Sequence, residues 1–199
     1  GVNIIIMSYS FSIEQAIRAA SVLHKDQVRK GQVPYPYITH LVAVAMIVSD
    51  YTDDENTIVA ALLHDTLEDT DYTIEELRDD FGAVVAEIVG ALTEPELKSN
   101  EKSSIVEQKK QYLKQLREAT EETLVVLAGD KIHSMRSVVE EYYEDHSGFI
   151  AEYGTSMESR MLLYQEVSNI LNRSLKNAIL TEFNSIFTGP YCKYVPILT

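Results

Sequence analysis

The sequence has few of the residues that build disulfide frameworks, fibrous repeats or flexible tracts. Its one cysteine, Cys192, excludes an intrachain disulfide and a cysteine-rich zinc site, and such scarcity is typical of a reducing compartment. With only 8 glycines and 5 prolines in 199 residues, the chain is neither collagen-like nor of low complexity. Hydrophobic residues make up 45% and charged residues 24%, which predicts an ordinary globular protein with a buried core.

Positive charge and long apolar runs are also scarce. Because 17 basic residues face 31 acidic ones, the formal net charge is -14, and this field repels nucleic acid and anionic membranes. No stretch approaches the roughly 20 apolar residues of a membrane span. The opening segment GVNIIIM lacks the basic lead and cleavage pattern of a secretion signal. We therefore expect a cytoplasmic protein with no nucleic-acid or membrane partner, and the sequence predicts no particular oligomeric state.

The length of the chain fits one domain, since domains commonly hold roughly 100–200 residues. No internal repeat is evident, and no linker divides the sequence. We predict a single domain over residues 1–199 with its core at about 11–187. Residues 1–7 and 189–199 are expected to be irregular, the latter because Pro190 and Pro196 interrupt regular structure.

Apolar residues recur at helical spacing along most of the chain, which predicts an all-α fold. Ser12 and Thr73 each begin a capping-box pattern, the sequence signature of a helix start. Gly31, Pro34 and Pro36 mark a loop, and polar residues 97–104 predict a surface loop. The predicted helices run from Ser12 to about Gln27, Thr39 to Ser49, about Asp54 to Asp69, Thr73 to Gly82, across Gln108 to Arg117, Thr120 to about Asp145, and, as one or two helices, Ser156 to about Phe187.

The segment ALLHDTLEDT concentrates ionisable side chains beside apolar ones. His64 and Asp65 are adjacent. Glu68 follows His64 by four residues and Asp69 follows Asp65 by four, so on one helix the two members of each pair share a face. Burying charge is costly unless the groups are paired or bind a metal. A solvated helix face is the alternative interpretation, but the adjacent histidine and the apolar flanks favour a functional site.

His40 and Asp130 extend this candidate site. His40 begins a predicted helix after PYIT, and Asp130 ends the apolar run LVVLAG. Two imidazoles and two carboxylates suit a divalent ion such as Mn, Fe, Co or Zn, with positions left for water and substrate. Alternatively, His40 caps a helix or lies in the core, and Asp130 pairs with a buried Arg or Lys.

In order along the chain, His40, the His64-Asp65 doublet and Asp130 resemble the H…HD…D signature of HD-domain metal-dependent phosphohydrolases. Within that superfamily, RKGQVPYPYITH, AALLHDTLEDT and LAGDKIHSMR are similar to the hydrolase domain of RelA/SpoT proteins and to the small alarmone hydrolases. The resemblance covers about Phe11 to Tyr164, and HDTLEDT followed by D-K-x-H-x-M-R is a specific combination. It implies an all-α HD-domain helical bundle.

The resemblance also implies an activity and roles for particular residues. The implied reaction is hydrolysis of the 3′-diphosphate of guanosine tetra- or pentaphosphate (ppGpp or pppGpp) to GDP or GTP and pyrophosphate, so the implied partner is a small guanine nucleotide. One Mn²⁺ would be held by His40, His64, Asp65 and Asp130. The implied catalytic pair is Glu68 and Asp69, and the implied substrate-binding residues are Arg29, Lys30, Ser134, Arg160 and Tyr164.

One position departs from the family pattern in a way that affects the substrate. Ser134 stands where the family commonly has an asparagine close to the substrate sugar, and serine lacks the amide's paired donor and acceptor. An HD phosphohydrolase acting on another nucleotide or on a 3′-phosphorylated cofactor is therefore a second hypothesis. A nucleotide-sensing binding module with little turnover is a third. His24 and His133 receive no predicted role.

Overall fold

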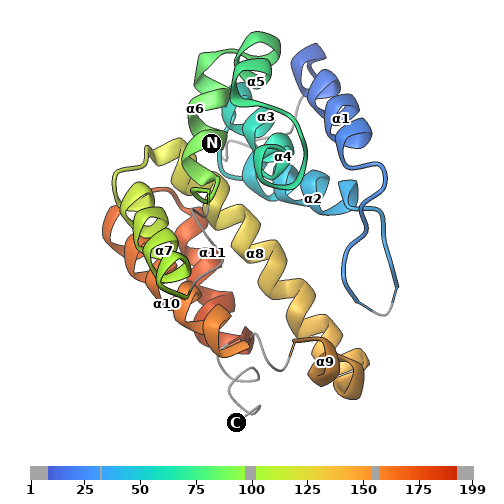
Figure 1. The fold of residues 1–199 in the computed structure, drawn as a ribbon, viewed down its shortest axis with the longest axis vertical. Coiled ribbons are helices and arrows are strands. Elements are labelled where there is room, and N and C mark those ends of the chain that lie inside the picture. The colour runs from blue at the N-terminus through green and yellow to red at the C-terminus, as the bar shows by residue number, and fades with distance from the viewer. Residues whose placement is uncertain (1–8, 32, 97–101, 154–156, 192–199) are drawn as a thin grey trace, which may run out of the picture.

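The structure, a computed structural model, describes residues 9–31, 33–96, 102–153 and 157–191 (Figure 1). Within these ranges the chain forms helices and no strand, apart from one isolated bridge between Val28 and Pro36, which confirms the predicted all-α class. None of the described helices is long and apolar enough to cross a membrane. The helices are α1 (Phe11–Leu23), α2 (Ile38–Ser49), α3 (Glu55–Leu63), α4 (Thr66–Asp69), α5 (Ile74–Phe81), α6 (Ala83–Leu92), α7 (Lys102–Arg117), α8 (Glu121–Glu144), α9 (His146–Tyr153), α10 (Met157–Ser174), α11 (Ile179–Ile186) and the short turn η1 (Phe187–Tyr191).

Helix α8 is the central element of the fold. It begins where the Thr120 side chain accepts a hydrogen bond from the backbone N–H of Thr123, and it contacts α2, α3, α6, α9, α10 and α11. In Figure 1, α8 runs between the group α1–α6 and the group α7, α10 and α11. The predicted apolar run at the start of this helix, residues 124–129, is buried. Because this segment of α8 is apolar on all sides, it can pack against several neighbouring helices at once.

A close approach of α2 to α8 sets the position of the candidate site. Gly129 of α8 lies at this close approach, since a Cβ atom placed on it would lie 2.7 Å from Cγ2 of Val48. The buried side chains of Val44 and Val48 face this contact. Because Gly129 precedes Asp130, the same packing brings Asp130 beside the start of α2, where His40 lies.

Two predicted boundaries of the first helix are wrong. Helix α1 is capped by Ser10, whose Oγ accepts a hydrogen bond from the N–H of Ile13, and not by Ser12. It ends at Leu23 instead of about Gln27. The chain from Gln27 onward pairs with the end of the following loop, through hydrogen bonds from Arg29 N–H to the Tyr35 carbonyl and from Tyr37 N–H to the Gln27 carbonyl. By contrast, the capping box at Thr73 is present with both of its hydrogen bonds.

The predicted helix from Asp54 to Asp69 is two helices, α3 and α4, separated by a turn at His64 and Asp65. At this break, side chains contact backbone carbonyl groups that in a continuous helix would accept hydrogen bonds from backbone N–H groups. The imidazole Nδ1 of His64 lies 2.7 Å from the Ala61 carbonyl oxygen, and the hydroxyl of Thr66 donates a 2.6 Å hydrogen bond to the Leu63 carbonyl. The adjacent His-Asp doublet therefore lies at a break in the helix, not on a continuous helical face.

The remaining differences lie in three places. Helices α6 and α9 are absent from the predictions, and α7 begins at Lys102, inside the expected loop 97–104, of which 97–101 lie outside the described residues. Apolar α6 follows α5 directly because Gly82 turns the chain at φ 91°. Residues 157–187 form two helices, as the sequence allowed. Residues 1–7 and 192–199 lie outside the described ranges. Residues 189–191 belong to the short turn η1, in which the dihedral angles of Gly189 are not helical and Tyr191 is buried.

Candidate metal centre

Four side chains from three segments converge at one point. His40 comes from α2, His64 and Asp65 from the turn between α3 and α4, and Asp130 from α8. Nε2 of His40 lies 3.3 Å from Oδ1 of Asp130 and 3.6 Å from Oδ2 of Asp65. Nε2 of His64 lies 3.2 Å from Oδ2 of Asp65 and 3.8 Å from Oδ1 of Asp130. The fold thus brings together all four residues that the sequence analysis singled out as metal ligands.

The donor atoms fit a divalent transition ion. Atoms that share an ion at about 2.1 Å in tetrahedral or octahedral geometry lie about 3.0–3.4 Å apart, close to the separations observed between the imidazoles and the carboxylates. Nε2 of His64 is buried and has no hydrogen-bond partner among the described residues. Because Nδ1 of the same ring contacts the Ala61 carbonyl, the lone pair of Nε2 points into the cluster. His40, His64 and Asp65 form a candidate divalent-metal site, and Oδ1 of Asp130 lies 3.3 Å from Nε2 of His40.

Hydrogen bonds from neighbouring residues orient both carboxylates. The hydroxyl of Tyr37 donates to Oδ2 of Asp65 at 2.7 Å. On α8, Nζ of Lys131 donates to Oδ2 of Asp130 at 2.7 Å, and Oγ of Ser134 donates to Oδ1 at 3.2 Å. Tyr37 and Lys131 are not among the predicted site residues, although Lys131 provides the ion pair considered as an alternative for Asp130. The adjacent D-K sequence is the signal that could have identified Lys131.

The electrostatics of the cluster favour a cation. Burial raises the pKa of Asp130, but Lys131 and the two imidazoles outweigh burial and hold this pKa well below its usual range. Burial lowers the pKa of His64, yet Asp65 and Asp130 outweigh burial and raise the pKa to about 9. For His40, burial dominates and its pKa falls. The two carboxylates therefore favour positive charge at the position they share with Nε2 of His64.

Three residues of the cluster, His40, Asp65 and Asp130, line a cavity of about 550 Å³, hereafter the metal cavity. His64 lines a smaller cavity of about 120 Å³, together with Asp65 and Asp130. Glu68 and Asp69 of α4 line the metal cavity beside Asp65. Both side chains are exposed toward the cavity, but its walls partly desolvate the Glu68 carboxyl, and burial together with Glu94 and Asp65 raises the pKa of Glu68 to about 7. Burial and then Asp65 raise the pKa of Asp69. Although the helix is broken, Asp69 keeps helical spacing from Asp65, since its N–H bonds the Asp65 carbonyl at 2.9 Å.

Positive side chains from separate segments line the same cavity. Arg29 and Lys30 come from the loop before α2, Arg160 comes from α10, and Lys109 of α7 is a cation that the sequence analysis did not select. Ser134 and Tyr164 also line the metal cavity, and Tyr164 stacks on Tyr191 with ring centres 5.3 Å apart. Every predicted substrate-binding residue therefore lines the same cavity as His40, Asp65 and Asp130.

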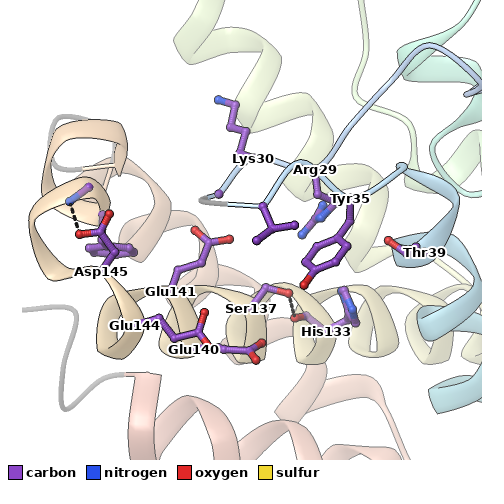
Figure 2. Close-up of a pocket in the computed structure, with 14 residues that line it drawn as sticks. Arg29, Lys30, Tyr35, Thr39, His133, Ser137, Glu140, Glu141, Glu144 and Asp145 are labelled. Carbon is purple, nitrogen blue, oxygen red and sulfur yellow. Dashed lines mark hydrogen bonds between the residues drawn. The ribbon is translucent and has the colours of Figure 1, made fainter.

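A second cavity of about 600 Å³ adjoins the first along α8 (Figure 2). Arg29, Lys30 and Ser137 line both cavities. Figure 2 shows the carboxylates of Glu140, Glu141 and Glu144 along α8, with Lys30 and Arg29 on the opposite wall. His133 lines this second cavity, and burial, followed by its neighbours His40 and Arg29, lowers its pKa to about 4.

The described residues thus form an all-helical fold that brings two imidazoles and two carboxylates together beside a polar cavity, an arrangement typical of divalent-metal sites. The model of the HD domain family matches residues 16–153, and the chain belongs to this family. The resemblance seen in the sequence is thereby confirmed.

Several named relatives match the same region. The guanosine-3′,5′-bis(diphosphate) 3′-pyrophosphohydrolase MESH1 of Danio rerio is 36% identical over 145 residues, which cover 65% of this chain and 77% of the relative. The Haemophilus influenzae protein of the same enzyme name is 39% identical over 118 residues, or 58% of this chain and 17% of the relative. A Streptomyces coelicolor GTP pyrophosphokinase is 37% identical over 127 residues, or 63% and 14%. The chain thus matches less than a fifth of these two longer relatives.

Solved structures share the fold. A metazoan ortholog of SpoT, described as hydrolysing ppGpp, superposes with a TM-score of 0.72 at 23% identity, covering 92% of this chain and 97% of the other. A Listeria monocytogenes protein superposes with a TM-score of 0.58 at 24% identity, covering 81% and 100%. The likeness to both structures establishes that the helical arrangement is that of a known fold.

Proposed function

We propose that this protein hydrolyses the 3′-diphosphate of ppGpp and pppGpp, releasing GDP or GTP and pyrophosphate. The observation that carries the proposal is the convergence of His40, His64, Asp65 and Asp130 beside a cavity that three of them line together with an acidic pair and cations. Membership of the HD domain family supports hydrolytic chemistry, and the name of the Danio rerio relative supports the substrate.

The proposed metal ligands are His40, His64, Asp65 and Asp130, and the proposed ion is one Mn²⁺. A divalent ion held there would neutralise phosphate charge and make water more acidic. Its ligands are already oriented by protein contacts, because Tyr37 bonds Asp65, while Lys131 and Ser134 bond Asp130. Such outer contacts fix the direction in which a ligand presents its donor atom.

Glu68 and Asp69 are the proposed catalytic pair. A group whose pKa lies near the working pH is an efficient proton acceptor, and that of Glu68 is about 7. Glu68 accepts a proton from water as the water oxygen forms a bond to the phosphorus next to the ribose. The bond from that phosphorus to the ribose 3′ oxygen breaks, and this oxygen takes a proton from Asp69, whose pKa is also raised.

The remaining lining residues are proposed to hold the substrate. A protein with a net charge of -14 repels a nucleotide carrying two diphosphates unless cations gather locally. Arg29, Lys30 and Arg160 supply that local positive charge, and Ser134 and Tyr164 add hydroxyl groups. Because these cations lie within a cavity, we also propose that the partner is a small nucleotide and that the protein binds neither nucleic acid nor a membrane. We propose the cytoplasm as its location.

The decisive experiment mixes metal-free protein with ppGpp, with and without added Mn²⁺, and separates the products by ion-exchange chromatography. We expect GDP and pyrophosphate only when Mn²⁺ is present, and no products from a His64→Ala variant treated in the same way. Release of inorganic phosphate with a guanine nucleotide that still carries a 3′-phosphate would place the broken bond elsewhere and overturn the proposed reaction.

Ser134 gives a specific reason to test a second substrate class. Its hydroxyl donates to Oδ1 of Asp130, and a serine cannot offer a substrate sugar the paired donor and acceptor of an amide. An HD phosphohydrolase for another nucleotide or a 3′-phosphorylated cofactor is therefore the alternative function. A panel of 3′-phosphorylated nucleotides would identify it by faster Mn²⁺-dependent turnover than ppGpp. Tight binding of ppGpp without turnover of any panel member would instead indicate a nucleotide-sensing module.

A further inference from the structure

An imidazole outside the proposed ligand set contacts the proposed ligand His40. His133 lies on α8, one turn after Asp130, and its Nδ1 is 2.8 Å from Nδ1 of His40. The ring centres are 4.8 Å apart, with the planes inclined by 51°. His133 lines the second cavity, at the side where Thr39 of α2 lies (Figure 2), but it is not part of the lining of the metal cavity.

The two nitrogen atoms of His40 have different surroundings. Nε2 faces the carboxylates of Asp65 and Asp130, whereas Nδ1 faces only His133 among the partners described for it. The ring of His40 is 1% exposed, so water does not replace a missing partner at Nδ1. A hydrogen bond between two imidazole nitrogens needs one donor and one acceptor, and a proton on both would leave them repelling each other.

Metal binding at Nε2 of His40 settles which nitrogen donates. A neutral imidazole that presents a lone pair at Nε2 carries its proton at Nδ1, so His40 must be the donor and Nδ1 of His133 the acceptor. His133 then carries its own proton at Nε2. This pattern also excludes His133 as a fifth ligand through Nδ1, because that lone pair is already used.

We propose that His133 is a positioning residue for the metal centre, which fixes the tautomer and the ring orientation of His40 by accepting the proton of its Nδ1. The inference rests on the proposed metal centre. It is independent of the substrate, since His133 lies outside the metal cavity where the nucleotide would bind. Outer partners of metal-bound histidines typically change metal affinity by about 10–100-fold when they are removed.

Two substitutions separate the hydrogen bond from the volume of the side chain. His133→Phe retains a ring of similar size but removes the acceptor, whereas His133→Asn is smaller and places a carbonyl oxygen near the position of Nδ1. Glu140→Gln is the matched control, because Glu140 lies two turns further along α8 and lines the second cavity but not the metal cavity. Equilibrium dialysis with Mn²⁺ alone measures the dissociation constant of each variant without any nucleotide.

We expect His133→Phe to weaken Mn²⁺ binding by about 10–100-fold, and His133→Asn and Glu140→Gln to stay within about threefold of the unsubstituted protein. Thermal unfolding of the metal-free proteins tests whether each variant folds. Equal Mn²⁺ affinity in folded His133→Phe and in the unsubstituted protein would overturn the role of His133 and leave the proposed function untouched. No Mn²⁺ binding by the unsubstituted protein would overturn the metal centre itself.

A spectroscopic measurement tests the same inference without any substitution. In the protein loaded with diamagnetic Zn²⁺, long-range nitrogen–proton NMR spectra report which ring nitrogen of each histidine carries the proton. We expect the proton on Nδ1 of His40 and on Nε2 of His133. A proton on Nδ1 of His133 would contradict the proposal, because that nitrogen could then no longer accept.

Discussion

Tyr37 donates a 2.7 Å hydrogen bond from its hydroxyl to Oδ2 of Asp65, and so joins the loop before α2 to the turn between α3 and α4. The same oxygen of Asp65 lies 3.2 Å from Nε2 of His64 and 3.6 Å from Nε2 of His40. Burial and the Asp65 carboxylate raise the pKa of the Tyr37 hydroxyl, which therefore stays protonated and remains a donor at neutral pH. A half-buried tyrosine thus orients the Asp65 carboxylate of the candidate metal centre.

Replacing Tyr37 by phenylalanine should weaken metal binding. The variant loses the donor to Asp65 while the ring still stacks on His24, so we expect the dissociation constant for Mn²⁺ to rise about tenfold. Tyr72→Phe is a matched control, because the Tyr72 hydroxyl also donates to a carboxylate, that of Asp80, which is not among the residues lining the metal cavity. Calorimetric titration of both variants with Mn²⁺ checks this prediction, and equal affinities would refute it.

Removing either proposed catalytic carboxylate should stop turnover without removing the metal. Glu68→Gln and Asp69→Asn retain the size and hydrogen-bonding capacity of the side chains but cannot exchange a proton, so kcat should fall about 10²–10⁴-fold. The metal content, measured by elemental analysis, should stay near that of the unsubstituted protein, because neither side chain belongs to the proposed ligand set. Loss of bound metal along with activity would instead make the replaced residue a ligand.

The pH dependence of the reaction should follow the carboxyl of Glu68. Since this group must be ionised to accept a proton, and its pKa is about 7, kcat should fall as the pH drops through about 7. After burial, Glu94 is the largest cause of the raised pKa, so Glu94→Gln should move the acid limb of the kcat profile to lower pH. The nearby exposed Glu96→Gln should leave the limb in place. An unshifted profile in Glu94→Gln would assign the limb to another group.

The contact between α2 and α8 should tolerate no added atom at Gly129. A Cβ there would lie 2.7 Å from Val48 Cγ2, so Gly129→Ala should destabilise the fold by about 1–3 kcal/mol. Gly90 offers the matched comparison, because its added Cβ would meet Ile74 Cδ1 at an ordinary 3.4 Å. Gly90→Ala should therefore stabilise by about 0.5–1 kcal/mol, the helical advantage of alanine over glycine. Denaturant unfolding of both variants measures the difference, and destabilisation of similar size in both would contradict the close packing.

The sequence was informative where local chemistry decides structure. The helical spacing of apolar residues and the capping box at Thr73 predicted helices that the structure contains. The sequence was misleading where side chains compete with the backbone. The doublet His64-Asp65 was placed within a continuous helix, but His64 and Thr66 bond the carbonyls of Ala61 and Leu63 and so end α3. Helix α6, rich in valine, was missed because a short apolar run has no distinctive periodicity.

The residue types and their order along the chain determined by themselves that two imidazoles and two carboxylates were available for a metal, and that an acidic pair followed the doublet. Only the tertiary structure decided that these groups meet, because His40 and Asp130 come together through the packing of α2 on the Gly129 face of α8. The tertiary structure also decided which neighbouring side chains contact the proposed metal ligands. Tyr37, Lys131 and His133 reach the ligands through contacts whose distance and direction depend on how helices pack, and no spacing in the sequence encodes those quantities.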